Sequence, residues 1–97
     1  MTTTTTMTLA ETLAFQVKLL REQHDSAKLH AARSIIKLPA EIARLTKISA
    51  DKGLALIERI KSGDPPSRRA LEAAIVETAA TAAWAAYWVE GLEQGAF

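Results

Sequence analysis

The sequence has no cysteine, and this absence excludes several classes of protein at once. A disulfide-stapled domain, a thiolate nucleophile and a cysteine-based zinc site all need residues that the chain does not have. Glycine is also scarce, with four in 97 residues, and the scattered glycines form no phosphate-binding loop. A chain of this length makes one small domain, for which association is a natural way to gain stability.

The chain also lacks an excess of charge of one sign, because it has 12 basic and 11 acidic side chains. No strong overall field therefore draws the chain toward nucleic acid or anionic lipid. The charges are nevertheless unevenly spread. Residues 8–37 and 38–63 each carry five basic and three acidic side chains, whereas residues 64–97 carry two basic and five acidic ones. This polarity favours segments that pack against each other, within one chain or between copies.

Long apolar runs and a targeting segment are also lacking. The opening MTTTTTMT has neither the basic nor the apolar region of a secretory signal. The longest apolar stretch, residues 79–89, is about half the length of a membrane span. We expect a cytoplasmic protein without a membrane span, in which residues 1–7 are a disordered threonine-rich tail and residues 8–97 form a single helical domain.

Two breaks divide the chain into three segments that favour helix. The first is Leu38-Pro39, since the residue before proline avoids the helical region and proline fits a first turn. The second is SGDPPS at residues 62–67, with Gly63 as a helix stop and either Asp64 or Ser67 as the next N-cap. The fold class expected is all-α, an elongated bundle that oligomerisation would complete. The three helices are expected at about 8–37, 39–62 and 65–94.

The first helix carries an apolar seam that is typical of packed helices. Its members, spaced by alternating steps of four and three, are Leu13, Val17, Leu20, His24, Ala27 and Ala31. In the second helix the corresponding stripe is small at Ser49 and Gly53, which allows a neighbouring helix to come close.

The third helix is apolar on more than one side. One side is formed by Leu71, Ile75, Thr78, Ala82, Ala85, Val89 and Leu92, whereas Trp84, Tyr87 and Trp88 gather about a third of a turn away. Tryptophan and tyrosine are typical anchors of protein interfaces. We therefore predict a non-enzymatic interaction protein that forms homo-oligomers and binds a protein partner through this aromatic face. In the alternative, the first helix folds back and covers both sides as core.

A second interpretation starts from PAEIARLTKIS at residues 39–49. This stretch resembles the helix-turn-helix segments of bacterial repressors. Ile42 and Ala43 match the first helix of that motif, Ile48 the apolar residue after the turn and Leu56 the last anchor of the recognition helix.

The resemblance implies a DNA-binding regulator that reads nucleic acid through residues 49–61, with Lys47, Lys52 and Arg59 as contacts. The sequence departs from the motif at two positions: Lys47 stands where glycine usually makes the turn, and Gly53 stands where a β-branched anchor is usual. These departures favour a single amphipathic helix, and the DNA reader is kept as an alternative.

The chain offers no recognisable chemistry. His24 and His30 are six residues apart, whereas a metal-binding pair on a helix needs three or four, so we predict no metal site, no cofactor and no catalytic residues. His24 lies in the apolar seam, where a hydrogen-bonded histidine is the ordinary case. The last alternative is an amphipathic coat on a membrane or granule surface, for which the first helix supplies basic residues outside its seam.

Overall fold

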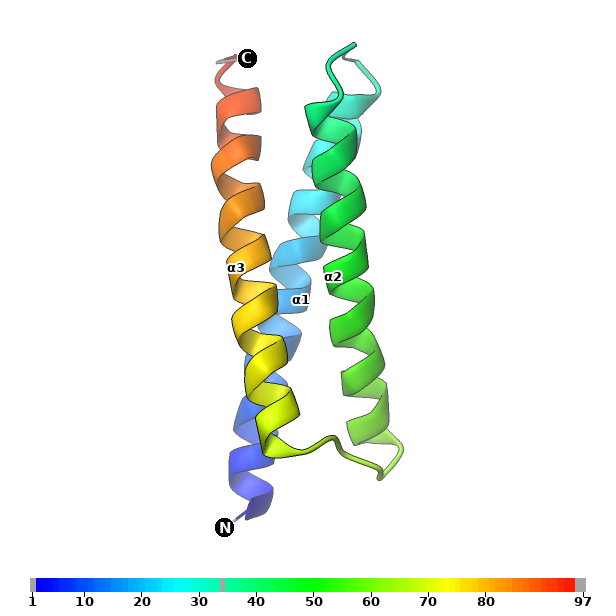
Figure 1. Ribbon diagram of the computed structural model, residues 1–97, viewed down its shortest axis with the longest axis vertical. Coiled ribbons are helices and arrows are strands. Elements are labelled where there is room, and N and C mark those ends of the chain that lie inside the picture. The colour runs from blue at the N-terminus through cyan, green and yellow to red at the C-terminus, as the bar shows by residue number, and fades with distance from the viewer. Residues whose placement is uncertain (1, 34, 96–97) are drawn as a thin grey trace.

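The computed structural model describes residues 2–33 and 35–95, with side chains from Thr8 onward. These ranges contain three helices, α1 (Thr2–Ala31), α2 (Leu38–Lys61) and α3 (Arg68–Glu93), and no strand (Figure 1). The helices run up, down and up, so that α1 and α3 are parallel and α2 is antiparallel to both. The principal extents of 49, 19 and 15 Å make the bundle elongated. The expected all-α fold is confirmed.

The largest difference from the expected helix bounds lies between α1 and α2. The sequence suggested one helix to residue 37, but α1 ends at Ala31 and residues 35–37 are bent. Because α2 runs back along α1, the chain needs these residues to reverse its direction. At the other end, the backbone of residues 2–7 belongs to α1 and their side chains lie outside the described part. That these residues form a disordered tail stays a prediction.

The turn between α2 and α3 follows its sequence signals closely. Gly63 has φ of +85°, the left-handed conformation in which glycine carries no steric penalty. Ser67, rather than Asp64, is the N-cap of α3, and its hydroxyl accepts a hydrogen bond of 3.1 Å from the backbone N–H of Ala70. The helix therefore begins at Arg68, three residues later than expected.

Loss of this cap gives a first testable effect. Ser67→Ala leaves a backbone N–H of α3 without its partner, which typically costs about 1 kcal/mol of folding free energy. The matched control is Ser62→Ala, because the Ser62 hydroxyl donates only to the Arg59 carbonyl at an exposed helix end. Urea denaturation should give a clearly lower midpoint for Ser67→Ala than for Ser62→Ala. Equal midpoints would show that the cap does not stabilise α3.

The core consists of two clusters that lie one above the other along the bundle. The central cluster contains Val17, Leu20, Ala50 and Ala82. The upper cluster contains Ala27, Ile42, Ala85 and Val89. Each cluster takes residues from all three helices, and four members of the predicted α1 seam are buried: Leu13, Val17, Leu20 and Ala27. The seam prediction is confirmed.

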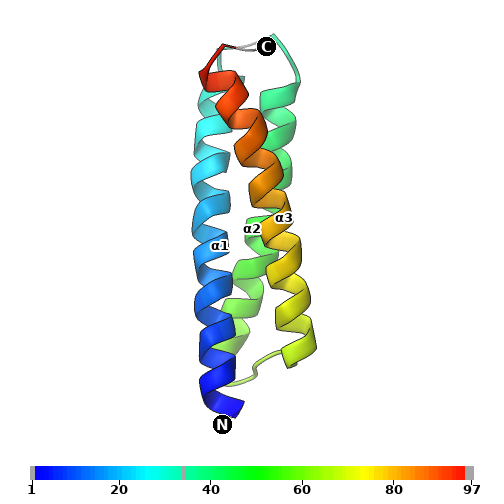
Figure 2. The ribbon, with the colours of Figure 1, turned by 90° about the vertical axis from the view of Figure 1, so that its left-hand side faces the viewer.

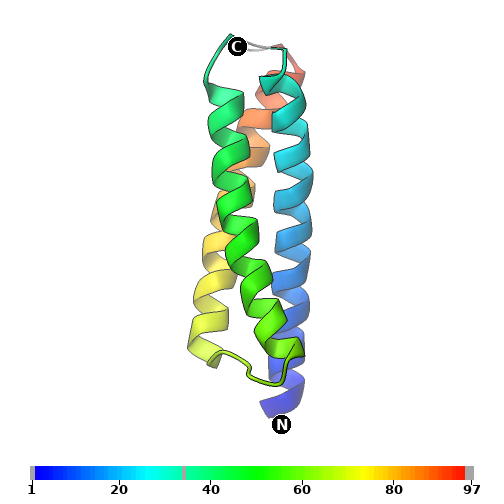
Figure 3. The same ribbon diagram turned by 90° about the vertical axis from the view of Figure 1, so that its right-hand side faces the viewer.

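The three helices do not contact one another equally. Helix α1 packs extensively against both neighbours, whereas α2 and α3 touch each other less. Figure 2 shows α1 beside α3, and Figure 3 shows α1 beside α2. The side of the bundle opposite α1 is therefore formed by α2 and α3 alone, and the candidate site lies there.

Candidate functional site

A shallow groove of about 380 Å³ runs between α2 and α3. Its lining residues are Leu45, Ile48, Ser49 and Lys52 from α2, and Glu77, Ala80, Thr81 and Trp84 from α3. Lys52 Nζ lies 3.5 Å from Glu77 Oε1, so an ion pair joins the two walls. The buried Ser49 hydroxyl has no hydrogen-bond partner within the described ranges. The groove is thus apolar at its upper part and charged at its lower part.

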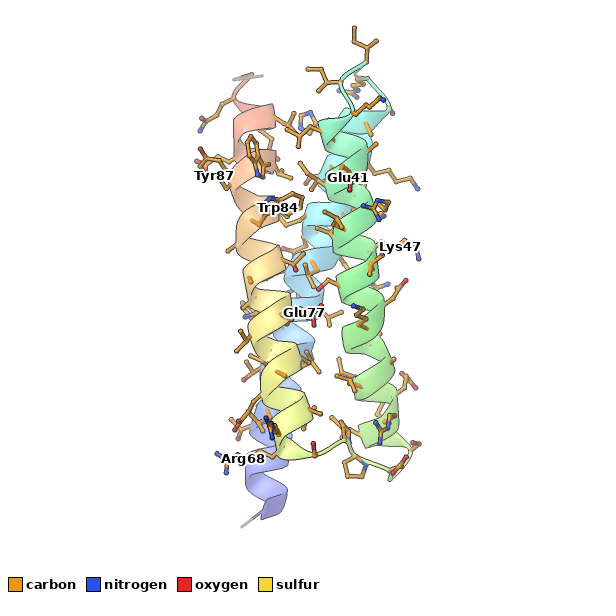
Figure 4. All side chains as sticks on the ribbon, viewed as in Figure 1. Glu41, Lys47, Arg68, Glu77, Trp84 and Tyr87 are labelled. Carbon is orange, nitrogen blue, oxygen red and sulfur yellow. The ribbon has the colours of Figure 1, made fainter. Side chains whose placement is uncertain are left out.

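The three predicted interface residues do not share one outward face. Trp84 and Trp88 are half-buried and pack against the upper core cluster. Tyr87 is 69 % exposed, and its ring meets the Trp88 ring edge to face, with 5.3 Å between the centroids and an angle of 87°. Figure 4 shows Trp84 on the side toward α2 and Tyr87 pointing away from it. A role in partner binding stays a prediction for all three.

The structure reveals a longer feature of which Tyr87 is only one part. We call it the outer stripe of α3, a row of exposed residues spaced by four, three, four, three and four positions. Its members are Arg69, Ala73, Val76, Ala80, Ala83 and Tyr87. This is the spacing of a helix-pairing seam, and here it lies on the solvent side of the bundle. The sequence analysis singled out Tyr87 of this row but missed the regular spacing of the other members.

The three candidate DNA contacts are exposed and do not converge. Lys47 pairs with Asp51 at 2.8 Å, Lys52 with Glu77 at 3.5 Å and Arg59 with Asp64 at 3.6 Å. Lys47 lines a hollow on the α1 side of α2, whereas Lys52 lines the groove on the α3 side.

The turn that the helix-turn-helix interpretation requires is absent. Helix α2 continues through Lys47 from Leu38 to Lys61, so residues 49–61 are not a separate recognition helix. The physical reason is that no residue near Lys47 breaks the helix, while Ile42, Thr46, Ser49 and Gly53 form one continuous buried side. Near the start of α2, Arg44 hydrogen-bonds the carboxylate of Glu41 and lowers its pKa, an exposed pair that supports the helix surface.

His24, which the sequence placed in the apolar seam of α1, takes part in a hydrogen bond between two helices. The Nδ1 atom of His24 lies 2.8 Å from the carbonyl oxygen of Ala43, a hydrogen bond that links α1 to α2.

Over residues 2–33 and 35–95, no group of three or more histidine, aspartate or glutamate side chains is placed to hold a metal ion. Within the same ranges, no helix has the length and apolar character needed to cross a membrane. The apolar seam of α1, which a surface coat would need for contact with lipid, is buried in the bundle.

Comparisons with protein-family models, with curated proteins and with solved structures found no match to this chain. The function is therefore inferred from the geometry of α2 and α3. The outer stripe of α3 beside the groove carries two exposed large apolar side chains, Val76 and Tyr87, at helical spacing.

Proposed function

We propose that this chain is a non-enzymatic helical interaction protein, which self-associates and binds protein through the outer stripe of α3 and the adjoining groove. Exposed apolar residues at regular spacing carry the proposal. Tyr87 and Val76 are 69 % and 70 % exposed, and three alanines of the stripe lie between and below them. Isolated exposed apolar side chains are common, but a contiguous apolar surface marks a binding site.

The surroundings of the stripe support the same proposal. Ile48 is 42 % exposed on the α2 wall of the groove, and the half-buried Trp84 lines the α3 wall. The groove thus continues the apolar surface from the stripe toward α2, and the two share Ala80. Alanine at the intervening positions of the stripe lets the backbones of α3 and a partner helix come close, so that the large side chains pack at their sides. This combination of large anchors and small spacers suits helix pairing better than it suits a small polar ligand.

The proposal is tested by measuring the mass of the protein in solution for the wild type and for two variants, one on α3 and one on α1. Tyr87→Ala removes the most prominent side chain of the stripe, and loss of such an anchor typically weakens binding by about 30-fold or more. Phe15→Ala is the matched control, because Phe15 is a 57 % exposed aromatic on α1. Light scattering after size exclusion should give a multiple of the chain mass for the wild type and Phe15→Ala, and a smaller mass for Tyr87→Ala.

Two results would contradict the proposal. A wild-type protein that is monomeric at several hundred micromolar does not self-associate. An oligomer that is unaffected by Tyr87→Ala uses another surface. Purification without nuclease and absorbance at 260 and 280 nm would also show whether nucleic acid accompanies the protein, which would favour the DNA-binding alternative.

A further inference from the structure

The charges of α3 stand at the unfavourable ends of the helix. Arg68 and Arg69 occupy its first turn, which contains no acidic residue, and Glu90 and Glu93 occupy its last turn, which contains no basic residue. The helix dipole favours the reverse arrangement, with acids at the N-terminus and bases at the C-terminus. The chain itself gives these groups only the Arg68–Glu72 ion pair and a hydrogen bond of 3.3 Å from the Gln94 side chain to Glu90, and a partner that supplies the opposite charges would satisfy the rest.

The neighbouring helices do not supply those partners. Within the described ranges no ion pair involves Arg69, Glu90 or Glu93. Arg68 pairs with Glu72 on its own helix at 2.8 Å. At the lower end of α2, Arg59 and Lys61 are paired with Asp64 at 3.6 Å and Glu58 at 3.9 Å, so these carboxylates are not available to Arg69. The exposed face that α3 presents is thus basic at its lower end and acidic at its upper end.

From this arrangement we propose that the outer stripe of α3 binds a second copy of the same chain, antiparallel and around a twofold axis close to Ala80. The inference rests on the proposed function, because it names the partner of that surface. Ala80 is the midpoint of the stripe when Glu90 is included. At 1.5 Å per residue, Arg69 lies about 17 Å below Ala80 and Glu90 about 15 Å above it. A twofold axis at Ala80 therefore brings Arg69 of each copy to the height of Glu90 of the other.

The same axis matches large side chains with small ones. Residues at equal distances from Ala80 along α3 come to the same height in the two copies. Tyr87 of one copy then lies at the height of Ala73 of the other, and Val76 lies at the height of Trp84, about 1.5 Å along the helix from Ala83. At the axis itself Ala80 meets its own symmetry mate, where two small side chains allow close approach of the helices. The interface is isologous and closes as a dimer.

A parallel pair is disfavoured by the same residues. It would place each Arg69 beside the other Arg69 and each Glu90 beside the other Glu90, so that like charges repel. It would also bring the two Tyr87 side chains to one height and leave the alanines facing each other. The antiparallel dimer is the arrangement that satisfies both the charge pattern and the size pattern.

Charge reversal tests the pairing. Arg69→Glu and Glu90→Arg should each weaken the dimer about tenfold, because each turns two attractive contacts into two repulsive ones. The double variant Arg69→Glu/Glu90→Arg should recover the wild-type dissociation constant. Within one chain these residues are about 32 Å apart, so recovery requires contact between copies. Arg68→Glu is the matched control, since Arg68 lies off the stripe, and it should leave the dimer unchanged.

Cysteine cross-linking tests the direction and the position of the axis, and the chain has no native cysteine to interfere. Under mild oxidation, Ala80→Cys should form a disulfide-linked dimer and Ala73→Cys should not. In the antiparallel pair the two residues at position 73 are about 21 Å apart along the helix direction. A parallel pair would cross-link both variants. Thermal unfolding of the reduced variants serves as the check that each one folds.

The outcomes separate this inference from the proposed function. A wild-type protein that is monomeric overturns both the proposed self-association and the antiparallel dimer. A different protein is then the remaining partner of the stripe to test. A dimer that Tyr87→Ala dissociates, but in which Ala73→Cys cross-links or the double charge reversal fails to recover binding, overturns the antiparallel arrangement alone. A dimer that is insensitive to Tyr87→Ala also overturns both.

Discussion

Replacing Trp88 by alanine is expected to lower the free energy of unfolding by about 3 kcal/mol. Full truncation of a buried tryptophan costs about 3 to 5 kcal/mol, and the lower end applies because Trp88 is half-buried. The side chain packs against the upper core cluster, so its loss opens a cavity at the upper end of the bundle. Urea denaturation, monitored by circular dichroism at the lowest practical protein concentration, measures the effect on the folded chain itself.

The neighbouring Tyr87 is the matched control for this measurement. Tyr87→Ala removes an exposed ring, and exposed substitutions usually change stability by less than about 0.5 kcal/mol. The two adjacent aromatic residues are therefore expected to have different roles. Trp88 stabilises the fold, and Tyr87 stabilises the association between copies. If Trp88→Ala keeps full stability and loses oligomeric mass, Trp88 is an interface anchor and the assignment to the core is wrong.

Gly53→Leu is expected to be at least as damaging, with a loss of about 3 kcal/mol. A Cβ atom at Gly53 would lie 2.5 Å from Val17 Cγ2, closer than such atoms approach one another in folded proteins. Leu13 and Thr78 lie just beyond, so the side chain would enter the point at which all three helices meet. Overpacking of a core costs about 1 to 3 kcal/mol, and leucine adds more volume than a single methyl group. Thermal and urea denaturation would both report the loss.

Two further variants identify the cause of this effect. Ala55→Leu places the same side chain on the exposed side of α2, where leucine is a good helix former, and should leave stability almost unchanged. Adding Val17→Ala to Gly53→Leu removes the contacting methyl group and should recover part of the loss. Failure of this second change to recover any stability would show that the clash with Val17 is not what makes glycine necessary.

The candidate site could be predicted from the sequence only in part. The sequence shows that α3 is the helix with the aromatic residues. Helical spacing places Trp84, Tyr87 and Trp88 together on one face, and this face was predicted to bind a partner. The partial burial of Trp84 and Trp88, and the exposure of Tyr87, depend on where the other helices lie relative to α3, which a single-helix projection does not contain. The spacing of Arg69, Ala73, Val76 and Ala80 was present in the sequence, yet alanine carries too little hydrophobic signal to distinguish a pairing seam from a solvated face.

The helix-turn-helix resemblance illustrates the same limit. An apolar residue at Ile48 fits both a turn followed by a recognition helix and a continuous helix with one exposed isoleucine. The sequence could not distinguish them, because both use the same local preferences. The continuous buried side of α2 from Ile42 to Gly53, packed against α1, selects the single helix.

What the sequence determined by itself is local: three helices, the seam of α1, the stop at Gly63 and an N-cap at either Asp64 or Ser67. These features depend on side-chain periodicity and on backbone preferences within a few residues. What only the tertiary structure decided is which apolar surfaces remain exposed. Because α1 packs extensively against both other helices, it buries one side of α3, and the smaller contact between α2 and α3 leaves the outer stripe exposed. That outcome depends on how three helices share a small core.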